Sequence, residues 1–288
     1  MTTNVNFRIY EDCGRQSNRL CYVPAHVFKQ LAETYPEGVG ENPKHERDFH
    51  CNLPTVDPRV QRILDILKGH GLRPASESLD RSSSEFGMRI DRKYDDTDFQ
   101  NCTYMVPRPT KYFGFTSRSN QGDLIIDARK QAIPYYDIGV YGRPLTIGVS
   151  EGIYRKVIEA NFSHLVLKRI LASIPQSDLP APTSLWEISS DLTLPPLSQK
   201  NRLITNEGSP FTKDMPVGCF LIEELYSPPE YHYTSSSFRS IEPFDFAITQ
   251  ERFSGHKIQM LITSKKFYEF CKRNQLPVDW IPVRLDPD

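Results

Sequence analysis

The chain has 288 residues, of which 38% are hydrophobic and 11% aromatic, and its mean hydropathy is -0.49. Its 35 basic and 36 acidic side chains leave a net charge of -1, which is no basic excess, so we expect neither nucleic acid nor membrane as a partner. The aromatic content excludes a largely disordered chain, and the length allows one large domain or two smaller ones.

The first hundred residues predict two helices and little regular strand. The second helix is the clearer one, because Asp57 can cap it, Pro58 suits its first position, and Gly69 and Gly71 follow its apolar face. The expected elements are a strand over 6–10, a helix over 23–34, a loop over 35–54, a helix over 56–67 and a surface excursion over 75–98.

From Cys102 onward, short aromatic and β-branched runs alternate with two short helices. We predict an α+β fold with mixed or antiparallel sheets and short packed helices. Residues 173–183 hold three prolines and no apolar period, so they are the candidate linker between halves 1–175 and 180–288, which either form one globule or two domains. The expected elements are strands over 104–106, 112–116, 123–127, 135–140, 145–149, 165–171, 185–188, 218–224, 244–249, 258–263 and 278–285, and helices over 150–160 and 264–274.

The two later helices lie in stretches that match each other. With Ser150 placed on Ser264, Tyr154 matches Tyr268 without a gap, and an aspartate lies upstream of each copy, at 137 and 245. The helix at Asp57 is a weaker third match. Either the chain repeats one strand–cap–helix–strand unit, or any capped helix before a strand gives this pattern; the shared Ser, Tyr and Asp favour a duplication.

The N-terminus and the cysteines indicate a reducing compartment. Residues 1–16 lack the basic start and apolar run of a signal peptide, and no apolar run nears the ~20 residues of a membrane helix. We therefore expect a cytoplasmic protein with reduced thiols, and we place Cys219 and Cys271 in the core because their neighbours are apolar. The six cysteines are Cys13, Cys21, Cys51, Cys102, Cys219 and Cys271.

Patterns that carry chemistry are weak. His45, His50 and Cys51 have neither helical zinc-ligand spacing nor a CxxC partner, which favours a solvated loop over a zinc site. No GxSxG, GxGxxG or GxxxxGK[ST] motif is present, so no cofactor is expected. Cys13 with His26 is interpreted as a coincidence of sequence.

Several charged side chains are expected to have structural or solvated roles. Asp123, Asp127 and Lys130 surround one predicted strand and are interpreted as solvated charges. Asp137 and Asp245 lie inside apolar strands, where they either face solvent or bond nearby backbone amides.

The segment SPPEYHYTSSSFRS supplies the candidate partner-binding residues. Aromatic residues and Arg in a loop are enriched at protein interfaces, but the same aromatics can also fix a long loop to the core. The candidates are Tyr226, Tyr231, His232, Tyr233, Phe238 and Arg239.

The C-terminal stretch LITSKKFYEFCKRNQLPVDWIPVRL resembles the end of immunity-type proteins of bacterial polymorphic toxin systems and their uncharacterised relatives. The residues that carry the resemblance are Ser264, Phe267, Trp280, Pro282 and Val283. The resemblance covers about the last fifth of the chain, and its residues are structural. It implies a binding protein that neutralises a toxin and supplies no catalytic residues, and the paired CxxC motifs of some relatives are missing here.

Two functions follow from these observations. The first is an intracellular binding protein of immunity type with a protein partner, a toxin. The alternative is a hydrolase-like enzyme of unfamiliar type, with a site between the two halves that gathers His50, His232 or Asp127. A structural or self-assembling module is the third possibility.

Overall fold

The structure, a computed structural model, divides the chain into two compact units. Unit 1 consists of residues 1–97 and 222–229, and unit 2 of residues 98–221 and 230–288. The residues that the structure describes are 1–11, 22–42, 45–75, 85–114, 116–118, 124–127, 136–141, 146–173, 181–201, 203–205, 219–222, 226–227, 229–253 and 259–288.

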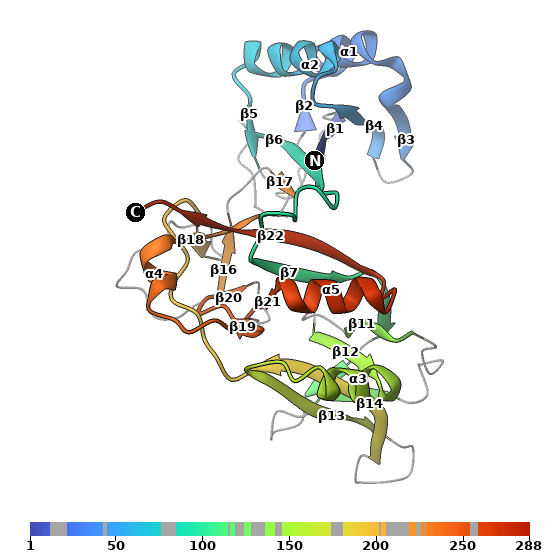
Figure 1. Ribbon diagram of the computed structural model, residues 1–288. Helices are drawn as coiled ribbons and strands as arrows, with labels where there is room; N and C mark the ends of the chain where they lie inside the picture. Colours follow the sequence, from blue (N-terminus) through green and yellow to red (C-terminus); the bar gives the residue numbers. More distant parts are fainter. Residues whose placement is uncertain are drawn as a thin grey trace. The chain divides into compact units, whose positions relative to one another are not determined.

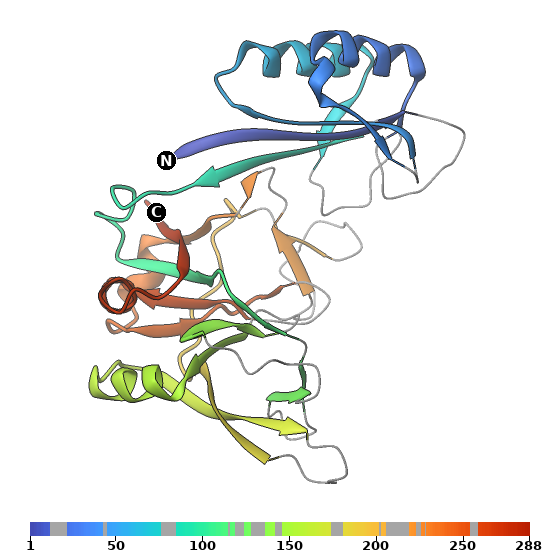
Figure 2. The same ribbon diagram turned by 90° about the vertical axis from the view of Figure 1, so that its right-hand side faces the viewer.

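Unit 1 is a βαββαβ unit, the order of elements in ferredoxin-like folds. Its main strands lie in the order β6–β1–β4–β3, each antiparallel to the next, and both helices cover one face of this sheet (Figures 1 and 2). The elements are β1 (Thr2–Glu11), β2 (Tyr22–Val23), α1 (Ala25–Thr34), the 3-10 turn η1 (Pro36–Gly38), β3 (Val39–Asn42), β4 (His45–Pro54), α2 (Pro58–Gly69), β5 (Arg73–Ala75), β6 (Glu85–Lys93) and β17 (Tyr226–Ser227).

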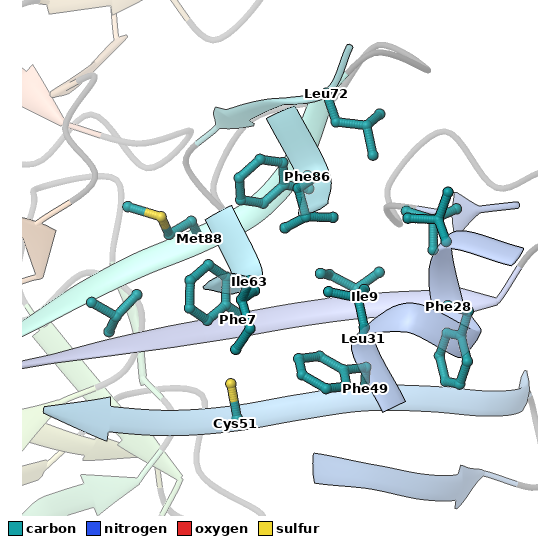
Figure 3. Packing of buried hydrophobic residues seen from close by; sticks show 14 of the residues in the cluster. Phe7, Ile9, Phe28, Leu31, Phe49, Cys51, Ile63, Leu72, Phe86 and Met88 are labelled. Carbon is teal, nitrogen blue, oxygen red and sulfur yellow. The ribbon is translucent and has the colours of Figure 1, made fainter. Parts of the chain in front are cut away.

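The core of unit 1 lies between the two helices and the sheet (Figure 3). Alternate residues of β1 are buried, and among them Phe7 lies beside Ile63 of α2 and Ile9 beside Leu31 of α1. The predicted cap of α2 is confirmed, because the backbone N–H of Arg59 donates to Asp57 Oδ1 at 2.9 Å.

Two expectations for unit 1 are wrong. Residues 35–54 hold β3 and β4 instead of a loop, and part of the expected excursion over 75–98 is β6, while residues 76–84 lie outside the described part. In β4 and β6, charged residues on the outer face break up the apolar pattern. The inner faces of these strands are apolar, since Phe49 and Phe86 are both fully buried. The outer faces are not, so the sequence shows no continuous apolar run.

Unit 2 contains the remaining elements, which form two larger sheets and a small one. The expected α+β class is confirmed by these short helices on mixed and antiparallel sheets. The elements are β7 (Tyr104–Pro109), β8 (Tyr112–Gly114), β9 (Thr116–Arg118), β10 (Leu124–Asp127), β11 (Ile138–Tyr141), β12 (Thr146–Ser150), α3 (Glu151–Glu159), β13 (Leu165–Ser173), β14 (Ala181–Ser190), β15 (Leu203–Thr205), β16 (Cys219–Ile222), β18 (Tyr231–Thr234), α4 (Ser235–Arg239), β19 (Phe246–Ile248), β20 (Arg252–Phe253), β21 (Leu261–Ser264), α5 (Lys265–Arg273) and β22 (Val278–Asp286).

The same strand arrangement recurs in the two larger sheets of unit 2. One contains the order β11–β12–β14–β13 and the other β19–β21–β7–β22. In each, an antiparallel pair leads into a helix and then a further strand, and another strand lies between the pair and that further strand. This middle strand is β14, which directly follows β13, in the first sheet, and β7, which comes from much earlier in the chain, in the second. Unit 1 has this order too, as β3–β4–β1–β6. The shared strand order is compatible with a duplication, but the middle strands differ in their place along the chain, and the duplication itself stays a prediction.

Matching hydrogen bonds accompany this topology in unit 2. The hydroxyl of Ser150 donates to Asp137 Oδ1 at 2.8 Å, and that of Ser264 donates to Asp245 Oδ1 at 2.7 Å. Each serine also donates its backbone N–H to the carbonyl of the same aspartate, at 3.0 Å in both cases. Ser150 also caps α3 as predicted, since its hydroxyl accepts from the backbone N–H of Ile153 at 3.4 Å, whereas the side chain of Ser264 makes no capping bond to α5.

Asp245 also joins the two large sheets of unit 2. Its Oδ2 accepts from the backbone N–H of Ser163 at 3.0 Å and from Lys266 Nζ at 3.2 Å. Burial works to raise the pKa of Asp245, but the bonds from Ser264, Ser163 and Lys266 outweigh it and lower that pKa. The predicted structural role for this residue is thus confirmed, with a backbone amide among its partners.

The division into units differs from the predicted one. Residues on both sides of the expected boundary at 175–180 belong to unit 2, where β13 and β14 pair directly in antiparallel register. Residues 174–180 lie outside the described part. Proline content indicated a linker here, whereas the flanking strands are neighbours in one sheet.

We predict that Asp245→Ala lowers the free energy of unfolding of unit 2 by about 2–3 kcal/mol at neutral pH, because charge-assisted hydrogen bonds are lost. The matched Asp137→Ala loses the hydrogen bond from the Ser150 hydroxyl and should cost about 1 kcal/mol. Urea unfolding followed by tryptophan fluorescence measures both, since the two tryptophans, Trp186 and Trp280, lie in unit 2.

The Asp245 contribution should also depend on pH. Because the folded pKa lies below the unfolded one, the contribution is complete above the unfolded pKa of about 3.9 and is lost as pH falls through the folded pKa. Wild type and Asp245→Ala should therefore converge in stability at strongly acidic pH. A difference that persists unchanged there would contradict an ionic role.

A second prediction concerns Gln275, which follows α5 with φ of 52°. Gln275→Val should lower the free energy of unfolding by about 1–2 kcal/mol, because a β-branched side chain is strained in the left-handed region. Gln275→Gly is the control and should retain or raise stability. Equal urea midpoints for the valine and glycine variants would contradict this account.

Candidate functional site

The structure places the predicted partner-binding residues in two strands and a short helix rather than in a loop. Tyr231 and Tyr233 of β18 and Phe238 of α4 are buried, which favours the interpretation that these aromatics fix the segment to the core. Arg239 is exposed at the end of α4, and Tyr226 belongs to β17 in unit 1. Partner binding by these residues stays a prediction.

Alternation along β18 explains this arrangement. Tyr231 and Tyr233 pair with Val283 and Leu285 of the parallel strand β22, and the Tyr233 ring lies 4.8 Å from that of Phe238. His232 points to the other face, where it is opposite Arg284. The segment therefore has one aromatic side and one charged side.

On the charged side, His232 lies between two largely buried carboxylates. Its Nδ1 is 3.2 Å from Asp286 Oδ2, and its Nε2 is 3.9 Å from Glu230 Oε2. The side chains of Glu230 and Asp286 are only 11% and 12% exposed, against 21% for His232. Buried carboxylates require compensating partners, and here Arg284 and Lys200 provide them.

Each carboxylate is paired with a more exposed cation. Arg284 Nη2 is 2.7 Å from Glu230 Oε1, to which Arg284 Nε also donates at 3.0 Å, and Lys200 Nζ donates to Asp286 Oδ1 at 2.7 Å. Burial works to raise the pKa of Asp286, but hydrogen bonds from Lys200 and His232 lower it overall. We call Lys200, Glu230, His232, Arg284 and Asp286 the charged cluster.

Residues 197–201, which we call the strap, complete the site along the outer edge of β18. The side-chain amide of Asn201 binds the backbone of β18 as a neighbouring strand would. Its Nδ2 donates to the carbonyl of Glu230 and its Oδ1 accepts from the backbone N–H of His232, both at 2.7 Å. The backbone N–H of Ser198 donates to the His232 carbonyl at 2.8 Å. The strap thus satisfies an otherwise unpaired strand edge and positions Lys200.

A buried carboxylate holds the start of the strap. Glu251 Oε1 accepts from the backbone N–H of Leu197 at 2.7 Å. Burial raises the pKa of Glu251, and burial together with the Glu251 charge raises that of Tyr233. Glu251 Oε2 and the Tyr233 hydroxyl are buried without a hydrogen-bond partner among the described residues.

Of the other sequence candidates that the structure describes, His50 and Cys51 do not form a joint site. His50 and Cys51 are neighbours on β4 and point to opposite faces: His50 is exposed and bonds Asn6 at 3.0 Å, while burial raises the pKa of Cys51 to about 12. Cys271 is buried as predicted. Cys13, Asp123 and Lys130, and the side chains of Asp127, His45 and Cys219, lie outside the described part.

Most of the charged cluster was missed by sequence reasoning. Glu230, Arg284, Asp286 and Lys200 drew no attention, although Glu230 with His232 and Arg284 with Asp286 show the spacing of two that places side chains on one strand face. That signal could have identified two charged pairs. Their proximity depends on the parallel pairing of β18 with β22, which neither strand encodes by itself.

Comparison of the chain with protein-family models, curated proteins and solved structures gives no match. Within the described residues, no three His, Cys, Asp or Glu side chains gather in a way that could hold a metal ion. In the same part of the chain, no helix is both long enough and apolar enough to cross a membrane.

We predict that Asn201→Ala lowers the free energy of unfolding of unit 2 by about 1–3 kcal/mol, because it leaves buried backbone groups of β18 without partners. The same variant should speed hydrogen exchange at the amide of His232, which NMR can measure directly. Asn52→Ala, at an exposed position of unit 1, is the control. Unchanged exchange at His232 would show that Asn201 does not hold the strand edge.

Proposed function

We propose that this chain is an intracellular binding protein of immunity type, which uses the face around His232 to bind a toxin protein. The observation that carries the proposal is the charged cluster, whose side chains are fixed in place by the strap and by β22 before any partner binds. Pre-organised charged groups lose little conformational entropy on association, which favours specific recognition.

The hydrogen-bond pattern around His232 supports binding over catalysis. Within the described residues, no hydroxyl or thiol hydrogen bonds to the His232 ring; the hydroxyls of Ser198 and Ser235 go instead to the side chain and the carbonyl of Asp286. A nucleophile of the serine or cysteine type needs a base within hydrogen-bond reach. The resemblance of the C-terminal stretch to immunity-type proteins also supports the proposal.

One observation favours the alternative of a hydrolase-like enzyme. An imidazole held by a carboxylate, as His232 is by Asp286 at 3.2 Å, is the arrangement of a general base. In this alternative, His232 would activate a water molecule, with Asp286 fixing the orientation of its ring. Turnover of ester or phosphodiester substrates that disappears in His232→Gln would support the enzyme over the binding protein.

The proposal is tested by co-expression with toxin genes encoded beside the gene of this chain. We predict that the chain restores growth to cells that produce its toxin and co-purifies with that toxin. His232→Gln should weaken the complex by about tenfold, the effect of losing one contact worth about 1.4 kcal/mol. His26→Gln, at an exposed position of α1, should leave growth and binding unchanged. Failure of every neighbouring toxin to bind the chain would contradict the proposal.

A further inference from the structure

We infer that the partner of the charged cluster is a protein surface rich in Asp and Glu, whose carboxylates bind Lys200 and Arg284. This inference rests on the proposed binding function and specifies its chemistry. It depends on the position of the charges in the cluster, where the carboxylates are buried and the cations are exposed.

In both ion pairs the cation faces solvent and the anion is buried. The side chain of Lys200 is 61% exposed and that of Asp286 is 12% exposed; the values for Arg284 and Glu230 are 40% and 11%. A molecule that approaches this face therefore meets the two cations first. Although the pairs are neutral in sum, their outer layer is positive, and a negative partner is the complementary one.

The cations also have the geometry to bind carboxylates. The ammonium group of Lys200 carries three N–H donors, and its one hydrogen bond within the described residues goes to Asp286. Arg284 lies directly opposite His232 in the β18–β22 ladder, so its guanidinium belongs to the same face as the imidazole. Ordered cations on two paired strands suit discrete carboxylates in a fixed arrangement.

A protein fits this face better than a nucleic acid does. Binding of a phosphate backbone requires an extended basic surface, whereas here the cations lie beside Glu230 and Asp286 and the whole chain has a net charge of -1. The closely spaced phosphates of a nucleic-acid backbone would also meet the acids behind the outer layer. Individual carboxylates on a folded surface can contact the cations and avoid those acids.

The experiment titrates the full chain into a fluorescently labelled decamer of glutamate at low ionic strength and records anisotropy. We expect binding that weakens as salt is added. Lys200→Glu should weaken it by about tenfold or more, since it replaces an attraction with a repulsion. The matched Lys29→Glu makes the same charge change at an exposed position of α1 in unit 1 and should change the affinity by less than about twofold.

A second variant guards against misfolding. Glu230→Gln with Arg284→Gln removes one ion pair without leaving a buried charge unpaired, and it too should weaken peptide binding at an unchanged urea midpoint. The inference is overturned if the glutamate decamer does not bind, if Lys29→Glu weakens binding as much as Lys200→Glu, or if oligothymidylate of matching length binds more tightly.

These outcomes separate the inference from the function on which it rests. If a toxin binds the chain but Lys200→Glu leaves that complex unchanged, the acidic-partner inference fails while the binding function stands. If the peptide binds as expected but no neighbouring toxin does, the charge chemistry stands and the toxin-binding function fails.

Discussion

The carboxylate of Asp245 is the contact on which the architecture of unit 2 depends. It binds the hydroxyl of Ser264 where α5 begins, the backbone of Ser163 after α3, and the ammonium group of Lys266. One side chain therefore connects the β19–β21 pair, the last helix and the neighbouring sheet. Directional hydrogen bonds to a carboxylate fix these elements in a way that apolar packing, which is non-directional, does not.

Aromatic packing supplies the burial around this junction. The ring of Phe162 lies 5.5 Å from each of Phe246, Phe267 and Phe270, in edge-to-face contact with all three. Lys266 extends over the same ring, with its Nζ 4.8 Å from the centroid. The polar contacts of Asp245 and the ring contacts of Phe162 thus connect the same two segments, the turn after α3 and the helix α5. Each set of contacts holds the residues of the other set in place.

The charged cluster arises because core-facing and charged residues alternate along two paired strands. β18 turns its tyrosines toward the core and His232 toward the charged face, and β22 does the same with Val283 and Arg284. The strap removes the exposed edge of β18 and adds Lys200 to the cluster. The result is a rigid charged face with an aromatic underside, and the binding function and acidic partner that we propose depend on this arrangement.

The sequence by itself determined helices α1, α2, α3 and α5, most strands of unit 2, the Asp57 cap and the α+β class, because each depends on local periodicity or on a side chain a few residues away. The short helix α4 was missed, since its segment was expected to be a loop. It also pointed to Asp245 and His232, but not to what they contact. Strands β4 and β6 escaped notice because charged residues occupy their outer faces. Only the tertiary structure decided that β7 lies between β21 and β22, and that Glu230, Asp286 and Lys200 surround His232. Such contacts join residues far apart in the chain, and pairing between strands is set by the burial of whole faces, which no short stretch of sequence records.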